Sequence, residues 1–162
     1  MTADEVIHAL AERGLTIAVA ESLTGGLLVA ELISVPGASA VVRGGVVAYD
    51  TALKHSVLGV SQELLDAHGA VDPEVAARMA DGVRRVCAVD GVPAALGIST
   101  TGVAGPDPQD GKPVGTVFVG ISTDAASQVV ELALHGDREA IRRGVVSESI
   151  AKLKDILTTL ST

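Results

Sequence analysis

The segment that decides the fold is residues 15–26, LTIAVAESLTGG, in which a short apolar run passes directly into a polar, glycine-rich turn. The run LTIAVA has the length and composition of a buried strand. At its carboxyl end, where open α/β sheets usually bind ligands, the turn would expose a hydroxyl and several backbone N–H groups. Ser22 or Thr24 could simply cap the helix that follows. The same turn could instead receive a phosphate, a carboxylate or a developing oxyanion.

On both sides of this segment the chain alternates between helical and extended patterns. We expect helices at residues 3–13, 25–35, 51–60, 61–69 and 72–89 and from 137 to about 160, and strands at 15–20, 41–49, 93–100, 115–123 and 127–135. Gly14 should stop the first helix, Asp72 and Asp137 should cap later ones, and Pro73 suits a first helical position. The last two strands flank the short turn DAA and predict an antiparallel hairpin. This order predicts a three-layer α/β/α sandwich with a mixed, mostly parallel sheet, formed as a single domain over residues 1–162.

Composition narrows the class of protein. Hydrophobic residues make up 48% of the 162 residues and charged residues 20%, which excludes a disordered chain. With one Phe, one Tyr and no Trp, the core must be almost purely aliphatic, as in helices packed on a mostly parallel sheet. The single cysteine, Cys87, excludes an intramolecular disulfide and any multi-cysteine metal site.

Charge and hydropathy exclude two kinds of partner. The net charge is −8 and the basic residues are scattered, so we expect no nucleic-acid binding. Mean hydropathy is positive, at +0.43. However, no apolar stretch reaches the roughly 20 residues of a spanning helix, so we expect no membrane association. The first residues lack the pattern of a signal peptide, and we expect a cytoplasmic protein.

Two further strand ends carry reactive or polar groups. The second strand leads into AYDTALK (48–54), with Tyr49 at its end and Lys54 near the start of a short helix. A lysine whose pKa is lowered by partial burial can deprotonate a serine, although an ordinary surface lysine is the alternative. None of the four histidines comes with an obvious Ser and Asp arrangement, so a Ser-His-Asp triad is not supported.

The third strand ends in STTGVAGP (99–106), where Thr101, Gly102 and Gly105 offer a hydroxyl, N–H groups and a tight turn. By itself this segment could be an ordinary well-formed loop. In GDREAIRR (136–143), a cap at Asp137 would place Arg138 in the first helical turn, where the dipole disfavours a basic side chain. An anionic partner is one explanation for an arginine there.

Four segments together, AESLTGG (20–26), GGVVAYDTALKHSVLGV (44–60), STTGVAGPDPQDGKPVGTVFVGI (99–121) and GDREAIRR, resemble the C-terminal domain of the competence/damage-inducible CinA family. That family includes stand-alone nicotinamide mononucleotide deamidases. The resemblance implies hydrolysis of the carboxamide of nicotinamide mononucleotide to nicotinic acid mononucleotide and ammonia, with no metal and no cofactor. It also implies a homodimeric α/β fold. The chain looks like the stand-alone form, since the larger members carry an additional N-terminal domain.

The resemblance also implies roles for individual residues. Ser22 becomes the nucleophile, Lys54 its base and Thr101 a group that orients or activates. The nucleotide would be held by Thr24, Gly25, Gly26, Tyr49, Gly102, Gly105 and Arg138, with Arg138 at its phosphate. The chain has Leu23 where the family commonly has Cys, which affects packing more than mechanism.

Two alternatives to this deamidase stay open. The domain could bind a nucleotide without turning it over, as a regulatory module. It could also be an amidohydrolase of the same fold that acts on a different amide, because substrate choice depends on the shape of the pocket.

Overall fold

The computed structural model of this protein describes residues 2–160. Its helices are α1 (Ala3–Arg13), α2 (Leu27–Ile33), α3 (Thr51–Ser56), α4 (Gln62–His68), α5 (Pro73–Val86) and α6 (Arg138–Thr159), with a short 3₁₀ turn η1 at Ala38–Ala40. Its strands are β1 (Ile17–Glu21), β2 (Val42–Val47), β3 (Leu96–Gly102), β4 (Thr116–Ser122) and β5 (Ser127–Ala133).

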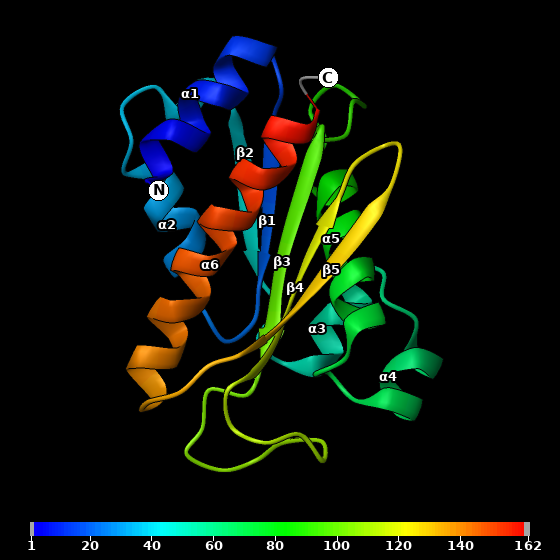
Figure 1. The fold of residues 1–162 in the computed structure, drawn as a ribbon. Coiled ribbons are helices and arrows are strands. Elements are labelled where there is room, and N and C mark those ends of the chain that lie inside the picture. The colour runs from blue at the N-terminus through cyan, green and yellow to red at the C-terminus, as the bar shows by residue number, and fades with distance from the viewer. Residues whose placement is uncertain (1, 161–162) are drawn as a thin grey trace.

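The strands form one mixed sheet between two layers of helices, which confirms the predicted α/β/α sandwich (Figure 1). Within residues 2–160 the strand order is β2-β1-β3-β4-β5. Strand β1 pairs in parallel with β2 and β3, whereas β3–β4 and β4–β5 are antiparallel, so the predicted hairpin is also confirmed. Helices α1, α2 and α6 cover one face of the sheet, and α5 packs on the other face with α3 and α4 on its side (Figure 1).

Helix ends follow the predicted signals. Gly14 adopts the left-handed conformation after α1, with φ 64°. The Asp72 side chain accepts from two backbone N–H groups at the start of α5, where Pro73 is the first residue. At the start of α6 the Asp137 side chain accepts from one backbone N–H group, that of Ala140. These caps are local in sequence, which is why the pattern alone locates them.

Several predicted boundaries near the candidate site are wrong. The strand predicted at 41–49 ends at Val47, and the helix predicted at 51–60 ends at Ser56. Helix α2 begins at Leu27 instead of residue 25, because Gly25 and Gly26 have φ values of 57° and 101°, which a right-handed helix does not contain. Strand β3 runs on to Gly102, so Thr101 lies within the strand instead of the turn after it.

The helical layer of α5 lies unusually close to the sheet. A Cβ added to Gly97 of β3 would overlap the carbonyl oxygen of Ala80, and one added to Gly120 of β4 would overlap that of Ala76. The opposite face is filled by larger side chains such as Ile17, Ile98 and Leu153. Glycines on the two strands therefore set the spacing between helix and sheet on one face only.

Within residues 2–160, no helix has the length and apolar character needed to cross a membrane.

Replacing Gly97 by alanine tests this close approach. We expect Gly97→Ala to lower the free energy of unfolding by roughly 1–3 kcal/mol, because the new methyl group would overlap the rigid Ala80 carbonyl as well as Cγ of Arg84. Urea denaturation measures the change. Gly144→Ala in α6 is the matched control, since its Cβ would meet only the flexible end of Leu134. Equal stability of Gly97→Ala and the wild type would show that α5 can move away from the sheet.

Candidate active site

A cavity of about 240 Å³ lies at the carboxyl ends of β1 and β3, the edge at which the sequence placed its three polar turns. Its walls come from the turn after β1, from α3 and the segment before it, from the end of β3 with the loop that follows, and from the start of α6. The lining residues are Ser22, Leu23, Tyr49, Thr51, Lys54, Ala70, Val71, Thr101, Gly102, Val103, Ala104, Gly105, Asp107, Gln109 and Arg138.

Ser22 and Lys54 meet inside this cavity. Lys54 Nζ donates a hydrogen bond to Ser22 Oγ at 3.0 Å and another to the carbonyl oxygen of Ala48 at 2.6 Å. The side chains come from different elements, since Ser22 follows β1 and Lys54 lies in α3. Lys54 is only 1% exposed, so its interpretation as an ordinary surface lysine is wrong.

Burial changes the acid–base chemistry of this lysine. Desolvation lowers the pKa of Lys54 from 10.5 to about 8, and the nearby carboxylates of Asp50 and Asp110 partly oppose that decrease. Near neutral pH a useful fraction of the amine is therefore uncharged and can accept a proton. The side chain in contact with it is a serine hydroxyl.

The capping interpretation of the turn after β1 is also wrong. The N-cap of α2 is Gly26, and no side chain of Ser22 or Thr24 caps the helix. Instead the buried carboxylate of Glu21 accepts from the N–H groups of Leu28 at 2.9 Å and Val29 at 3.1 Å. Sequence reasoning missed this role of Glu21, because the residue ends β1 and lies well before the first residue of α2.

Three of the residues expected to bind substrate follow Ser22 in the turn but lie outside the lining of the cavity. Thr24, Gly25 and Gly26 do not line the cavity. The Thr24 hydroxyl pairs with that of Thr100 at 2.8 Å, and Gly25 N–H donates to the Ser22 carbonyl at 3.1 Å. These contacts shape the turn, and the role of the three residues as ligands of the substrate stays a prediction.

Leu23 offers one of the backbone N–H groups that the sequence predicted for this turn. Its side chain lines the cavity, and its backbone N–H directly follows Ser22. Within residues 2–160 that N–H has no hydrogen-bond acceptor. A free donor beside a nucleophile is suited to binding a developing oxyanion.

Thr101 and the two later glycines do line the cavity, as the sequence placed them. The Thr101 hydroxyl donates to the carbonyl oxygen of Ala70 at 2.7 Å, so its lone pairs remain available to a ligand. A Cβ on Gly102 would come within 2.6 Å of the Val117 side chain, which explains glycine there by packing.

Arg138 and Tyr49 form the outer part of the cavity. Arg138 donates from Nη1 to the carbonyl oxygen of Gly105 at 2.6 Å and from Nη2 to the Tyr49 hydroxyl at 3.1 Å. Both acceptors are neutral, and no carboxylate pairs with this arginine in the described part of the chain. Its positive charge is therefore available to an anion at the mouth of the cavity.

A second arginine of α6 supports the turn after β1 and was not anticipated from the sequence. Arg142 Nε donates to the carbonyl oxygen of Leu23 at 2.9 Å, and its Nη1 pairs with Glu139 at 3.1 Å. Its guanidinium also lies against Gly25, where a Cβ would be 3.4 Å from Nη2. Arg142 thus holds the turn from outside, 119 residues away in sequence from the group it binds.

Metal ions in proteins are usually held by clusters of His, Cys, Asp and Glu side chains. Over residues 2–160, no three or more His, Cys, Asp and Glu side chains gather closely enough to hold a metal ion. The polar side chains that line the cavity are those of Ser22, Tyr49, Thr51, Lys54, Thr101, Asp107, Gln109 and Arg138.

The buried lysine should leave a signature in the stability of the protein. Because the pKa of Lys54 is about 8 in the folded state and 10.5 when unfolded, the unfolded chain binds more protons between these two pH values. The free energy of unfolding should therefore contain a contribution from Lys54 that rises with pH across this window, on the order of 2 kcal/mol.

Lys54→Met should remove that contribution, because the variant has no amine to desolvate. Urea denaturation at about pH 7 and about pH 10 measures the difference between the two proteins. Lys154→Met, at an exposed lysine, is the control and should keep the wild-type dependence. The same rise with pH in Lys54→Met and wild type would contradict a lowered pKa for Lys54.

Known proteins resemble this chain along nearly its whole length. The sequence matches the family model described as the CinA C-terminal domain over residues 1–157. A CinA-like protein from Frankia casuarinae is 46% identical over 155 residues, which cover 96% of this chain and 35% of that protein. A relative from Geobacillus sp. (strain WCH70), assigned by name to the competence-damage inducible proteins, is 52% identical over 139 residues, which cover 85% of this chain and 32% of that protein. This chain therefore spans about a third of the length of these curated relatives.

Solved structures share the fold. A competence-damaged protein (CinA) superfamily protein from Klebsiella pneumoniae 700603 superposes with a TM-score of 0.91 at 31% identity, covering 97% of this chain and 96% of that one. The competence/damage inducible protein CihA from Agrobacterium tumefaciens gives 0.87 at 32% identity, covering 96% and 93%. With the family model matched over residues 1–157 and the fold shared with both structures, this chain belongs to the CinA C-terminal domain family.

Proposed function

We propose that this protein is an amidohydrolase that converts nicotinamide mononucleotide to nicotinic acid mononucleotide and ammonia. The observation that carries the proposal is the 3.0 Å contact between Lys54 Nζ and Ser22 Oγ inside a cavity. A serine beside a lysine whose pKa is lowered to about 8 is an activated nucleophile without histidine. The family resemblance supports the choice of substrate.

The first half of the reaction forms an ester on the serine. Neutral Lys54 takes the proton from Ser22 as Oγ attacks the carboxamide carbon. The N–H of Leu23 receives the oxyanion of the tetrahedral intermediate. Protonated Lys54 then donates its proton to the departing nitrogen, so ammonia leaves and the acyl-serine remains.

The second half regenerates the enzyme. Lys54, neutral again, deprotonates a water molecule, which attacks the acyl carbon. The intermediate collapses, Lys54 returns the proton to Ser22 Oγ, and nicotinic acid mononucleotide is released. One amine with a pKa near the working pH suits both directions of proton transfer.

Binding of the nucleotide is assigned to the outer part of the cavity. Arg138 bonds to neutral oxygens only and is free to pair with the phosphate. Tyr49 is 60% exposed and lies beside this guanidinium, where its hydroxyl can also reach the anion. Thr101 lies deeper and offers its lone pairs to the amide nitrogen of the substrate.

Single-domain organisation, a homodimeric state, a cytoplasmic location and independence from cofactors belong to the same proposal. Size-exclusion chromatography with light scattering measures the state of assembly.

The first test is ammonia release from nicotinamide mononucleotide by wild type, Ser22→Ala and Lys54→Ala, without added metal. We expect release by the wild type and a decrease of roughly 10³-fold or more in each variant, because nucleophile and base act as a unit. Circular dichroism verifies that the variants fold. Near-wild-type rates in Lys54→Ala would reject the serine-lysine mechanism.

Calorimetric titration of Ser22→Ala with nicotinamide mononucleotide separates the remaining alternatives. Binding by this variant, with no turnover by the wild type, would indicate a nucleotide-binding module. Absence of both binding and turnover would point to an amidohydrolase with another amide as substrate.

Arg138→Met tests recognition of the phosphate. We expect kcat/KM for nicotinamide mononucleotide to fall roughly 10²-fold, mostly through KM, since a charge-assisted contact is lost. Nicotinamide riboside lacks the phosphate and should be turned over equally by variant and wild type. Arg143→Met, at an exposed arginine of the same helix, is the control. Equal losses for both substrates would place the phosphate elsewhere.

A further inference from the structure

Three hydrogen bonds join a short turn that lines the cavity to β3 and to the loop between β3 and β4. The turn, residues 69–71, precedes α5, and its Ala70 and Val71 line the cavity. Thr101 of β3 donates to the Ala70 carbonyl oxygen at 2.7 Å. From the loop between β3 and β4, Asp110 Oδ2 accepts from Ala70 N–H at 3.1 Å, and Lys112 Nζ donates to the Val71 carbonyl oxygen at 3.2 Å.

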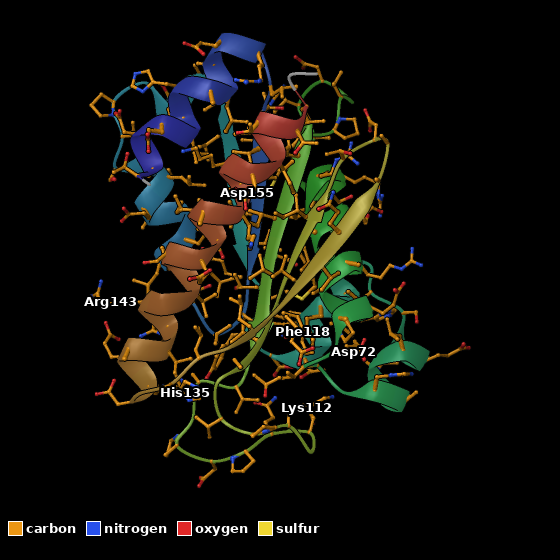
Figure 2. All side chains as sticks on the ribbon, viewed as in Figure 1. Asp72, Lys112, Phe118, His135, Arg143 and Asp155 are labelled. Carbon is orange, nitrogen blue, oxygen red and sulfur yellow. The ribbon has the colours of Figure 1, made fainter. Side chains whose placement is uncertain are left out.

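Of the three side chains that make these hydrogen bonds, Asp110 is the acidic one. The conformation of the backbone around it fixes its position. It lies in a tight turn closed by two hydrogen bonds between Gln109 and Lys112, at 3.2 and 2.8 Å, and has a φ of 51°. Figure 2 shows Lys112 on this loop, at the same end of the molecule as Asp72 and the start of α5.

Gly69 leaves room for the carboxylate of Asp110. A Cβ at position 69 would lie 2.6 Å from Cγ and 2.8 Å from Oδ2 of Asp110. The loop therefore touches the turn closely enough that a side chain there would separate them. The close approach brings an acidic group next to the segment whose Ala70 and Val71 line the cavity.

The charge of Asp110 reaches the catalytic lysine. Together with Asp50, which caps the helix that contains Lys54, it raises the pKa of Lys54 against the larger lowering by burial. The other titratable or charged side chains of the cavity are Tyr49, Asp107 and Arg138.

We propose that Asp110 is a positioning residue for the reaction of Ser22 and Lys54. Its carboxylate holds the 69–71 turn against the cavity through Ala70 N–H, and its fixed negative charge acts on the amine of Lys54. This assignment rests on the proposed function for its catalytic meaning. Its two parts, the hydrogen bond and the charge, can be measured on the protein without turnover.

Asp110→Asn separates the charge from the hydrogen bond, because asparagine keeps the shape and one acceptor oxygen. Without the charge the pKa of Lys54 falls, so the acidic limb of the kcat/KM profile should move to lower pH by roughly half a unit. Activity at mildly acidic pH should then rise about threefold, while the maximal rate stays within a factor of about two. Asp110→Ala also loses the hydrogen bond, and its maximal rate should fall.

Two measurements on the free protein complete the test. NMR titration of the Lys54 side chain should show the same decrease in both Asp110 variants, and none in Asp155→Asn, a control on α6 at the opposite end of the molecule (Figure 2). Hydrogen exchange at the Ala70 amide should stay slow in Asp110→Asn and become fast in Asp110→Ala.

The outcomes distinguish this assignment from the proposed function. An unchanged pKa of Lys54 in Asp110→Asn, or equal exchange of the Ala70 amide in both variants, would overturn the role of Asp110. A decrease in the pKa together with the change in exchange supports that role, even if the wild type releases no ammonia from nicotinamide mononucleotide. Absence of ammonia would then count against the deamidase alone.

Discussion

The desolvation of one amine is the constraint on which the site depends. Lys54 is almost fully buried, and the hydrogen bonds that satisfy it come from Ser22 Oγ and the Ala48 carbonyl oxygen. A charged ammonium there has too little water around it, and this is the main reason its pKa is lowered to about 8. Chemistry and stability are therefore linked, since the same burial that makes the amine a base costs folding free energy near neutral pH.

The sheet brings the remaining groups to that amine. Because β1 and β3 are parallel neighbours, their carboxyl ends meet at one edge and place Ser22 next to β3 and its loop. Because β4 is antiparallel to β3, it begins at the end of the sheet where β3 finishes. The loop that joins them therefore lies beside the cavity. Helix α6 then supplies two arginines, Arg138 to the outer cavity and Arg142 to the turn after β1.

Local signals predicted most of the fold. Caps at Asp72 and Asp137 bond to N–H groups within three residues, so the sequence pattern contains the whole interaction. Motif resemblance added the pairing of Ser22 with Lys54, which lie 32 residues apart. Composition and periodicity alone had left Lys54 as a possible surface residue, because burial of a lysine depends on how α3 packs.

What the sequence could not predict are contacts between distant segments. Arg142 reaches Leu23 across 119 residues, and Asp110 reaches Ala70 across 40. No pattern at either end specifies such a partner, since an arginine in a helix and an aspartate in a loop are common on surfaces. The partner of Thr24 could not be predicted for a similar reason, since its hydroxyl pairs with that of Thr100 on the neighbouring strand β3.

The glycine contacts beneath α5 have a consequence for how the protein tolerates change. On the α6 face, bulky side chains separate helix from sheet, and such a layer can repack when one of its members changes size. On the α5 face, main chain rests almost on main chain at Gly97 and Gly120, and a rotamer change cannot absorb added volume there. Gly97 lies on the same strand as Thr101, four residues before it. The layer between α6 and the sheet can therefore adjust to a change in side-chain volume, whereas the layer between α5 and the sheet cannot. Strand β3, which contributes to the cavity, packs against α5 in the layer that cannot adjust.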